Sequence, residues 1–252
     1  MKQGTFALEV NNVSKSFGGV HAVRNCSFHV EEGTLTALIG PNGAGKTTMF
    51  NMINGFLLPD RGAIHFRGED VTKSSVWERS RLGMSRTFQL SRIFRNLSLR
   101  ENLILAVRQD DDLFWRMFMR HEPDILFEEK ISAMLAFVGL KKSLDVPITD
   151  LSYGEQKLFD LARALLNPHT FLLFDEPVAG VNPVLREALK AILTRLKEKG
   201  ETILLIEHDM DFVRSVAGRV IVMEEGSVLT EGTPEKVLAE KRVLEAYLGP
   251  QK

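Results

Sequence analysis

One segment constrains this chain more than any other. Gly40-Pro41-Asn42-Gly43-Ala44-Gly45-Lys46-Thr47-Thr48 fits the phosphate-loop pattern G-x-x-x-x-G-K-[ST]. The apolar run at residues 35–39 precedes it and is typical of a strand buried on both faces, and a helix is expected from residue 46 to about residue 56. Because strand, loop and helix are the context that this motif requires, a plain glycine-rich turn is the weaker alternative.

Each residue type in this loop has a physical reason to be there. Glycines let the backbone wrap around phosphates with N–H groups pointing inward, and the start of the helix adds a positive dipole. Lys46 is expected to reach the β- and γ-phosphates, and the Thr47 hydroxyl is expected to bind Mg²⁺. The segment therefore predicts a site for ATP and Mg²⁺ that includes Asn42, Gly43, Ala44, Gly45 and Thr48.

The rest of the chain alternates between strand and helix patterns. Short alternating strands are expected near residues 6–10 and 28–30, buried strands at 171–174, 203–206 and 220–223, and helices at 183–199 and 209–217. From about residue 99 to residue 166 the apolar residues recur at helical spacing only. This pattern predicts an α/β fold: a mostly parallel sheet with right-handed crossovers, an N-terminal antiparallel part and an inserted helical subdomain.

The length of 252 residues allows a single domain with a sizeable core. We expect one domain over residues 1–252, with an α/β core at 1–88 and 167–252 and a helical subdomain at about 89–166. The 32 Lys and Arg against 33 Asp and Glu argue against a nucleic-acid partner. Neither a signal peptide nor an apolar run of membrane-spanning length is found, so work at a membrane requires docking on another chain.

Two acidic residues follow the buried strand at residues 171–174. Asp175 is expected to orient the metal ion, and Glu176 is placed to polarise an attacking water. Alone, the pair would more often be two solvated acids at the end of a strand. The phosphate loop earlier in the chain makes the nucleotide-site interpretation the stronger one.

Leu151-Ser152-Tyr153-Gly154-Glu155-Gln156 resembles the signature sequence of ABC-type ATPases, Leu-Ser-Gly-Gly-Gln. Tyr153 and Glu155 depart from that pattern, whereas Ser152 and Gly154, which the resemblance places against a phosphate, are kept. A plain helix cap at Ser152 is the alternative for the motif alone. The order of this motif among the others makes the resemblance specific, and it covers essentially the whole chain.

Further positions match the family residue by residue. Gln89 stands where the family has its glutamine loop, which implies a γ-phosphate sensor and metal contact, and His208 stands at the position of the switch histidine, which holds the γ-phosphate. Ala179-Gly180-Val181-Asn182 replaces a loop that usually ends in Asp. Phe17 fits the aromatic residue that stacks on adenine and fits a core aromatic equally well.

Within the family the chain is similar to the ATPase subunits of importers for branched-chain amino acids and related amides, and to the ATPase of lipopolysaccharide export. The motifs that carry this likeness are Thr87-Phe88-Gln89, Ala179-Gly180-Val181-Asn182-Pro183, Ile206-Glu207-His208-Asp209-Met210 and Tyr247-Leu248-Gly249. The resemblance implies an ATPase at the cytoplasmic face of the cell (inner) membrane, held there by membrane-spanning permease subunits and working indirectly with a substrate-binding protein.

The resemblance also implies a head-to-tail dimer, with an identical chain or a paralogue, in which Ser152 and Gly154 act on the partner's ATP. Apolar residues near 94–97 and 114–118 are expected to dock the permease, or else to form the insert's own core. A soluble ABC ATPase without membrane partners is the second hypothesis. A phosphate-loop kinase or GTPase is the third, although no guanine-specifying Asn-Lys-x-Asp is found.

Overall fold

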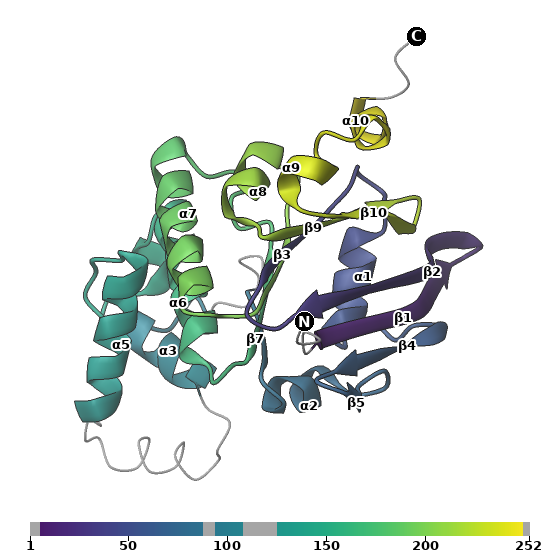
Figure 1. Cartoon of the computed structure of the whole chain (residues 1–252). Helices are drawn as coiled ribbons and strands as arrows, with labels where there is room; N and C mark the ends of the chain where they lie inside the picture. The colour runs from purple at the N-terminus through teal and green to yellow at the C-terminus, as the bar shows by residue number, and fades with distance from the viewer. Residues whose placement is uncertain (1–5, 88–93, 108–124, 249–252) are drawn as a thin grey trace.

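The computed structural model describes residues 6–87, 94–107 and 125–248, and the strands of this part form two sheets (Figure 1). The four-stranded sheet has the order β2-β1-β4-β5 and consists of β1 (Phe6–Phe17), β2 (Val20–Glu31), β4 (Arg61–Phe66) and β5 (Glu69–Asp70). The six-stranded sheet has the order β10-β9-β3-β8-β7-β6 and consists of β3 (Leu35–Ile39), β6 (Met84–Arg86), β7 (Phe171–Asp175), β8 (Ile203–Ile206), β9 (Arg219–Glu224) and β10 (Ser227–Gly232). The first sheet is antiparallel, and the second is parallel from β9 to β6 with β10 antiparallel at its edge, which confirms the predicted fold class.

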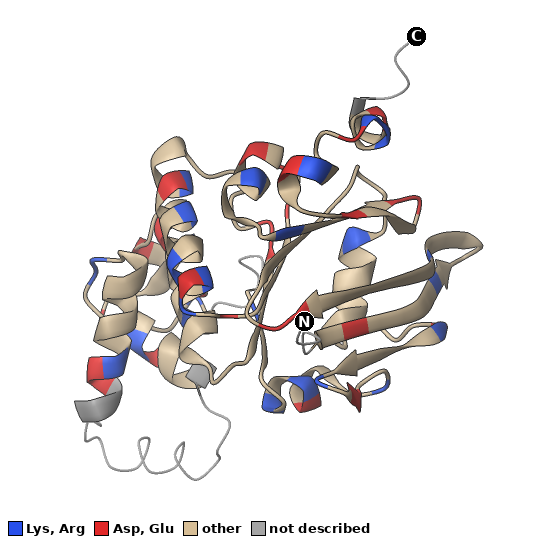
Figure 2. Cartoon of the chain, viewed as in Figure 1, with Lys and Arg blue, Asp and Glu red and all other residues tan. Residues whose placement is uncertain are grey.

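Helices cover both faces of the larger sheet, and three of them form a helical part beside it. They are α1 (Lys46–Ile53), α2 (Val76–Arg81), α3 (Leu99–Val107), α5 (Ile125–Val138), α6 (Tyr153–Leu166), α7 (Pro183–Glu198), α8 (Met210–Val216), α9 (Pro234–Val237) and α10 (Lys241–Leu248), with a 3-10 turn at Ile148–Asp150. Helices α3, α5 and α6 gather on the side of the sheet away from the β1–β2 hairpin (Figure 1). No helix in the described residues is long and apolar enough to cross a membrane. Residues of both charge signs lie along α7, whereas on α5 they gather near its start (Figure 2).

Alternation along the central strands divides the interior into two apolar cores. On β3, Leu35, Ala37 and Ile39 face a core shared with α3 and α5 to α9, whereas Leu38 faces a core shared with α1 and the antiparallel sheet. Strands β7, β8 and β9 divide their residues in the same way. The prediction that the apolar runs form strands buried on both faces is therefore confirmed, because both faces of this sheet are covered.

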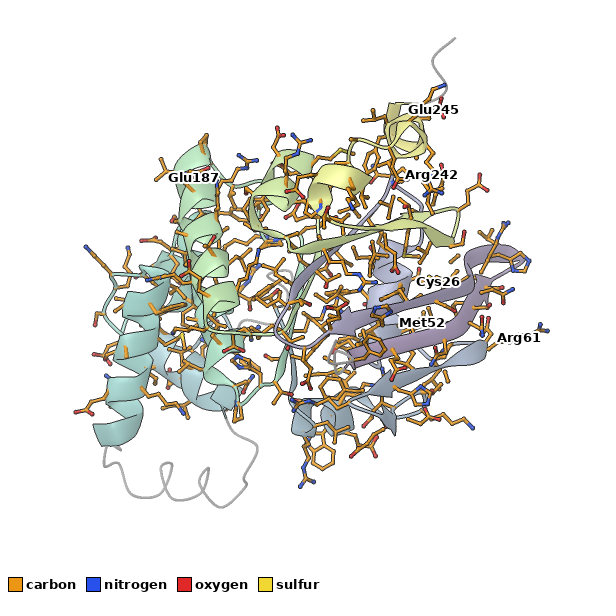
Figure 3. All side chains as sticks on the ribbon, in the orientation of Figure 1. Cys26, Met52, Arg61, Glu187, Arg242 and Glu245 are labelled. Atoms are coloured by element: carbon orange, nitrogen blue, oxygen red, sulfur yellow. The ribbon has the colours of Figure 1, made fainter. Side chains whose placement is uncertain are left out.

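Helix α1 lies between the two sheets. Met49, Phe50, Met52 and Ile53 are fully buried there, and Figure 3 labels Met52 with Cys26, which belongs to the same core. Truncating a side chain of this kind to alanine costs about 2–5 kcal/mol of folding free energy. The helix that follows the phosphate loop is thus anchored on two sides, and this fixes the direction in which its first turn points.

Helix α1 ends at Ile53, three residues earlier than the predicted end near residue 56. Asn54 caps the helix and Gly55 takes a left-handed conformation with φ of 82°. The guanidinium of Arg79, which is fully buried, donates to the carbonyls of Met52 at 2.7 Å and Ile53 at 2.5 Å. The last carbonyls of a helix have no i+4 donor, and Arg79 supplies donors to two of them; that of Met52 also accepts from the N–H of Gly55 at 3.2 Å. Arg79 therefore stabilises this end of the helix.

Arg79 also tethers the segment before its own helix. Its guanidinium donates to the carbonyl of Val71 at 2.5 Å, to that of Thr72 at 3.2 Å and to that of Ser74 at 3.1 Å. Burial lowers the pKa of Arg79 to about 10, and the charge of Asp70 opposes this shift. The side chain therefore fastens α2 to α1 through main-chain acceptors.

Candidate nucleotide-binding site

The predicted phosphate loop connects β3 to α1, and glycine is required at two of its positions. A Cβ added to Gly40 would lie 2.1 Å from the carbonyl oxygen of Met223, and one added to Gly45 would lie 2.3 Å from that of Ala22. Both residues also have positive φ, 152° and 94°. The loop thus packs against its neighbours so closely that only glycine fits at these points.

The start of α1 is arranged to receive an anion. Gly45 is the N-cap and has no side chain to accept from the first N–H groups, and the first turn contains no acidic residue. Asn42, Gly43 and Thr47 are exposed, and Thr48 is half-buried. Because the first N–H groups of a helix have no partner within it, they are left free to bind phosphate oxygens. The residues present therefore fit the phosphates of a nucleotide.

Lys46 is the cation of this loop and is 8% exposed. Its ammonium donates to the carbonyl of Gly40 at 2.6 Å and to that of Pro41 at 2.9 Å, and no carboxylate in the described chain forms an ion pair with it. Burial lowers the pKa of Lys46, and the nearby charge of Glu176 acts in the opposite direction. A buried ammonium held only by carbonyls is suited to bind a phosphate.

Asp175 and Glu176 lie at the same edge of the sheet as the phosphate loop. Ile206 at the end of β8 pairs with Leu38 on one side and with Asp175 on the other, so the three parallel strands end together. Asp175 is 9% exposed, and one of its carboxylate oxygens accepts a hydrogen bond from Arg86 at 2.7 Å. The predicted metal-orienting acid is therefore next to the loop, with a carboxylate oxygen of the kind that Mg²⁺ prefers.

Glu176 has a left-handed backbone conformation with φ of 47°, which is uncommon for a residue other than glycine. Its N–H donates to the carbonyl of Ile206 at 3.0 Å, which holds the residue against β8. His208 Nδ1 lies 3.8 Å from Glu176 Oε1. The structure thus brings the predicted base and the predicted switch histidine together at this edge.

The side chain of Glu207, beside His208, was not predicted to matter, yet it is fully buried. One carboxylate oxygen accepts from the N–H of Val178 at 3.1 Å and the other from the N–H of His208 at 3.1 Å. Burial raises the pKa of Glu207, and these backbone donors counteract the shift. Glu207 therefore joins the loop after Glu176 to the loop that carries His208. The signal was available, since a charged residue directly follows a strand buried on both faces.

The predicted signature sequence forms the start of α6. Ser152 is the N-cap, and Glu155 closes a capping box with it: the N–H of Ser152 donates to Glu155 Oε2 at 2.9 Å, and the N–H of Glu155 donates to Ser152 Oγ at 3.4 Å. The departure from Gln to Glu at position 155 is thus compatible with the helix start. Among the described residues, no hydrogen bond or ion pair joins Ser152 to residues 40–48 of its own chain.

Tyr153 replaces the first glycine of the family's signature, and its side chain connects two loops. The phenol donates to the carbonyl of Ala179 at 3.2 Å, and a Cβ added to Gly180 would lie 3.5 Å from the phenol oxygen. Lys157, one turn further along α6, has its ammonium 3.4 Å from the carbonyl oxygen of Glu176. The segment between β7 and α7 is therefore held by α6 as well as by Glu207.

Phe17 ends β1 and is 48% exposed, so the alternative of a core aromatic is wrong. The ammonium of Lys15 lies 5.7 Å from the centre of its ring. Asn182 caps α7 by accepting from the N–H of Leu185 at 2.9 Å, which gives the residue a local reason to be there. Gln89 lies outside the described residues, as does the apolar group at 114–118.

The sequence profile of the family described as ABC transporter matches residues 23–179. The chain is 37% identical over 248 residues to the probable branched-chain amino acid transport ATP-binding protein LivG of Archaeoglobus fulgidus, covering 97% of this chain and 96% of that protein. It is 36% identical over 250 residues to the high-affinity branched-chain amino acid transport ATP-binding protein BraF of Pseudomonas aeruginosa, covering 96% of this chain and 97% of that protein. A solved ATP-binding cassette of an ABC transporter in its ADP conformation shares 33% identity and a TM-score of 0.84, covering 97% of this chain and 99% of that one.

Proposed function

The chain belongs to the ABC transporter family as an ATPase, and we propose that it powers the import of branched-chain amino acids. Near-full-length identity of 36–37% to proteins named for that transport carries the proposal, and the phosphate loop supports it. Lipopolysaccharide export and a soluble ABC ATPase are the alternatives, and the names of these relatives favour import over both.

In this proposal the residues at the sheet edge divide the work. Lys46 and the N–H groups of residues 42–48 bind the phosphates, and Thr47 and Asp175 hold Mg²⁺ together with Gln89. The metal ion supplies charge neutralisation at the phosphates when it is bound. Glu176 accepts a proton from the attacking water, and the adjacent His208 holds the γ-phosphate.

We place the second half of each site on a partner subunit. Ser152 and Gly154 begin α6, where the helix N-terminus and the serine hydroxyl face a phosphate of the opposite chain. In the described part of the chain no hydrogen bond or ion pair joins Ser152 to residues 40–48, and this supports the arrangement. The partner is either an identical chain or a paralogue.

Ser152→Arg should abolish ATP hydrolysis while the isolated monomer keeps its ATP affinity within about twofold, since Ser152 acts on the partner's nucleotide. Calorimetry on the monomer and phosphate release by the assembled protein measure the two quantities. Ser152→Ala loses the same cap, worth about 1 kcal/mol, so its melting temperature shows how much stability Ser152→Arg loses through the cap alone. A loss of monomer affinity as large as that of a phosphate-loop variant would place Ser152 in its own chain's site.

We propose that the chain is a peripheral subunit at the cytoplasmic face of the cell membrane, docked on permease subunits. A substrate-binding protein delivers the solute to these permease subunits. Phe94 supports a docking point: it is 57% exposed, and Asn102 holds its turn by accepting from the N–H of Phe94 at 3.0 Å and donating to its carbonyl at 3.1 Å. Leu97 beside it is half-buried. A partner that covers this ring would bury apolar area, and because the turn is already fixed, little ordering entropy would be lost on docking.

Phe94→Asp should reduce transport by the assembled complex at least about tenfold and leave the ATPase activity and melting temperature of the isolated subunit unchanged. The reason is that the ring lies outside both cores, so its loss affects only what docks on it. Leu244→Asp, at an exposed apolar position on α10, is the matched control and should transport normally. A lower melting temperature for Phe94→Asp would instead mean that the ring belongs to the subunit's own packing.

Uptake of labelled leucine, isoleucine and valine tests the proposed function. A strain that lacks the gene should lose high-affinity uptake of these amino acids, and wild-type protein should restore it, whereas Lys46→Ala should not. Uptake of a sugar is the control and should stay constant. Normal branched-chain uptake in the deletion strain, with no other importer of these solutes induced, would contradict the substrate class.

A further inference from the structure

Arg86 is the last residue of β6, and its charged side chain is almost buried, at 10% exposure. One guanidinium nitrogen, Nη2, donates to Asp175 Oδ2 at 2.7 Å. The other, Nη1, donates to Asn51 Oδ1 at 2.9 Å. The side chain therefore joins the end of β7 to α1, the helix that begins at the phosphate loop.

Aromatic side chains fix the position of this guanidinium. The centre of the Phe50 ring lies 4.9 Å from Arg86 Cζ, and that of Phe56 lies 5.6 Å away. Asp175 is equally shielded, with a side chain that is 8% exposed. Because screening by water is weak at such a place, the guanidinium and the carboxylate interact more strongly than a surface pair does.

We propose that Arg86 is a positioning residue that competes with Mg²⁺ for Asp175. The inference rests on the proposed function, in which Asp175 holds the metal ion. Arg86 occupies one carboxylate oxygen of Asp175 and places a positive charge beside the other. Mg²⁺ therefore enters against a like charge and shares the carboxylate with the guanidinium or displaces it.

The competition has a thermodynamic signature that separates it from a structural role. Binding of the imido analogue of ATP, which is not hydrolysed, is measured by calorimetry with Mg²⁺ and with EDTA. The ratio of the two affinities reports the contribution of the metal ion alone. Damage to the fold lowers both affinities and leaves the ratio unchanged, whereas removal of a competitor raises it.

Arg86→Met should raise this ratio about tenfold, since a like charge next to Asp175 is gone. Arg86→Gln, which is also neutral but keeps a hydrogen-bond donor, should do the same and serves if the methionine variant does not fold. Arg86→Lys keeps the charge and should leave the ratio within about twofold of the wild type. An unchanged or lower ratio in both neutral variants would overturn the competition.

Arg219→Met is the matched control. Arg219 is buried to a similar degree, at 18% exposure, and pairs with Glu31 at 2.9 Å and Glu231 at 2.9 Å. It begins β9, at the end of the sheet opposite the phosphate loop, so the ratio should stay at the wild-type value. A rise in this variant would show that the ratio responds to any lost buried arginine, which would also overturn the inference.

Asp175→Asn separates this inference from the proposed function. It should reduce the ratio toward one, and adding Arg86→Met to it should have no further effect. A ratio that Asp175→Asn leaves unchanged would remove Asp175 as the metal ligand and the proposal with it. If the ratio fell with Asp175→Asn but did not change with Arg86→Met or Arg86→Gln, the competition would be refuted and the proposed function would stand.

Discussion

Lys46→Ala should lower ATP affinity at least about 100-fold, to below detection in calorimetry. The ammonium is the only cation of the predicted phosphate loop itself, and it is already desolvated, so its charge acts on a phosphate with little screening. The carbonyls of Gly40 and Pro41 that it holds would lose their donor. Hydrolysis should disappear with binding.

The fold should survive this substitution. A buried ammonium without a carboxylate partner stabilises a protein little, so the melting temperature without nucleotide should fall by less than a few degrees. Lys241→Ala, which removes an exposed lysine on α10, is the control and should bind ATP normally. If ATP bound equally well to Lys46→Ala and to wild-type protein, residues 40–48 would not be the nucleotide site.

Glu176→Gln should hydrolyse ATP at less than about one hundredth of the wild-type rate and still bind it with Mg²⁺. An amide of the same shape cannot take a proton from water, whereas Lys46 and Asp175 are unchanged. If each nucleotide bridges two chains through Ser152 and Gly154, unhydrolysed ATP shifts the population toward the dimer. We expect a dimer in ATP and a monomer in ADP by size-exclusion chromatography.

The double variant Lys46→Ala, Glu176→Gln is the control and should remain monomeric, because no nucleotide is held between the chains. Where the natural partner is a paralogue, that chain is added before the measurement. Hydrolysis close to the normal rate would exclude Glu176 as the base. A Glu176→Gln chain that stays monomeric in ATP with its partner present would contradict the composite site.

The fold could be predicted from the sequence because its signals are local. Four apolar runs correspond to β3, β7, β8 and β9; the predicted helix at 183–199 is one residue longer than α7 at its end, and that at 209–217 is one residue longer than α8 at each end. The predicted end of α1 near residue 56 is wrong because it runs past Asn54 and Gly55, and a glycine in a left-handed conformation commonly follows a helix end. The second support of this end, the hydrogen bond from Arg79 to the carbonyl of Ile53, comes from 26 residues away in the chain and leaves no local signal.

The motif residues of the site could be predicted from the sequence, whereas the side-chain contacts that hold them in place could not. Lys46, Asp175, Glu176 and His208 follow or end buried strands, and parallel strands bring such positions to one edge. The side-chain contacts of Tyr153, Arg86 and Glu207 depend on how β6, β7 and α6 pack, which spacing does not encode. Tyr153 departs from the family pattern in sequence, and only the folded chain brings its phenol to the carbonyl of Ala179.

Arg79 has a consequence for how this fold can diverge. Every acceptor that its guanidinium uses is a main-chain carbonyl, which all twenty residue types provide. The hydrogen bonds to Arg79 therefore place no requirement on the side chains at those positions, which are constrained only by their own packing. Coevolution statistics, which find contacts through paired substitutions, would carry no trace of this connection between α1 and α2.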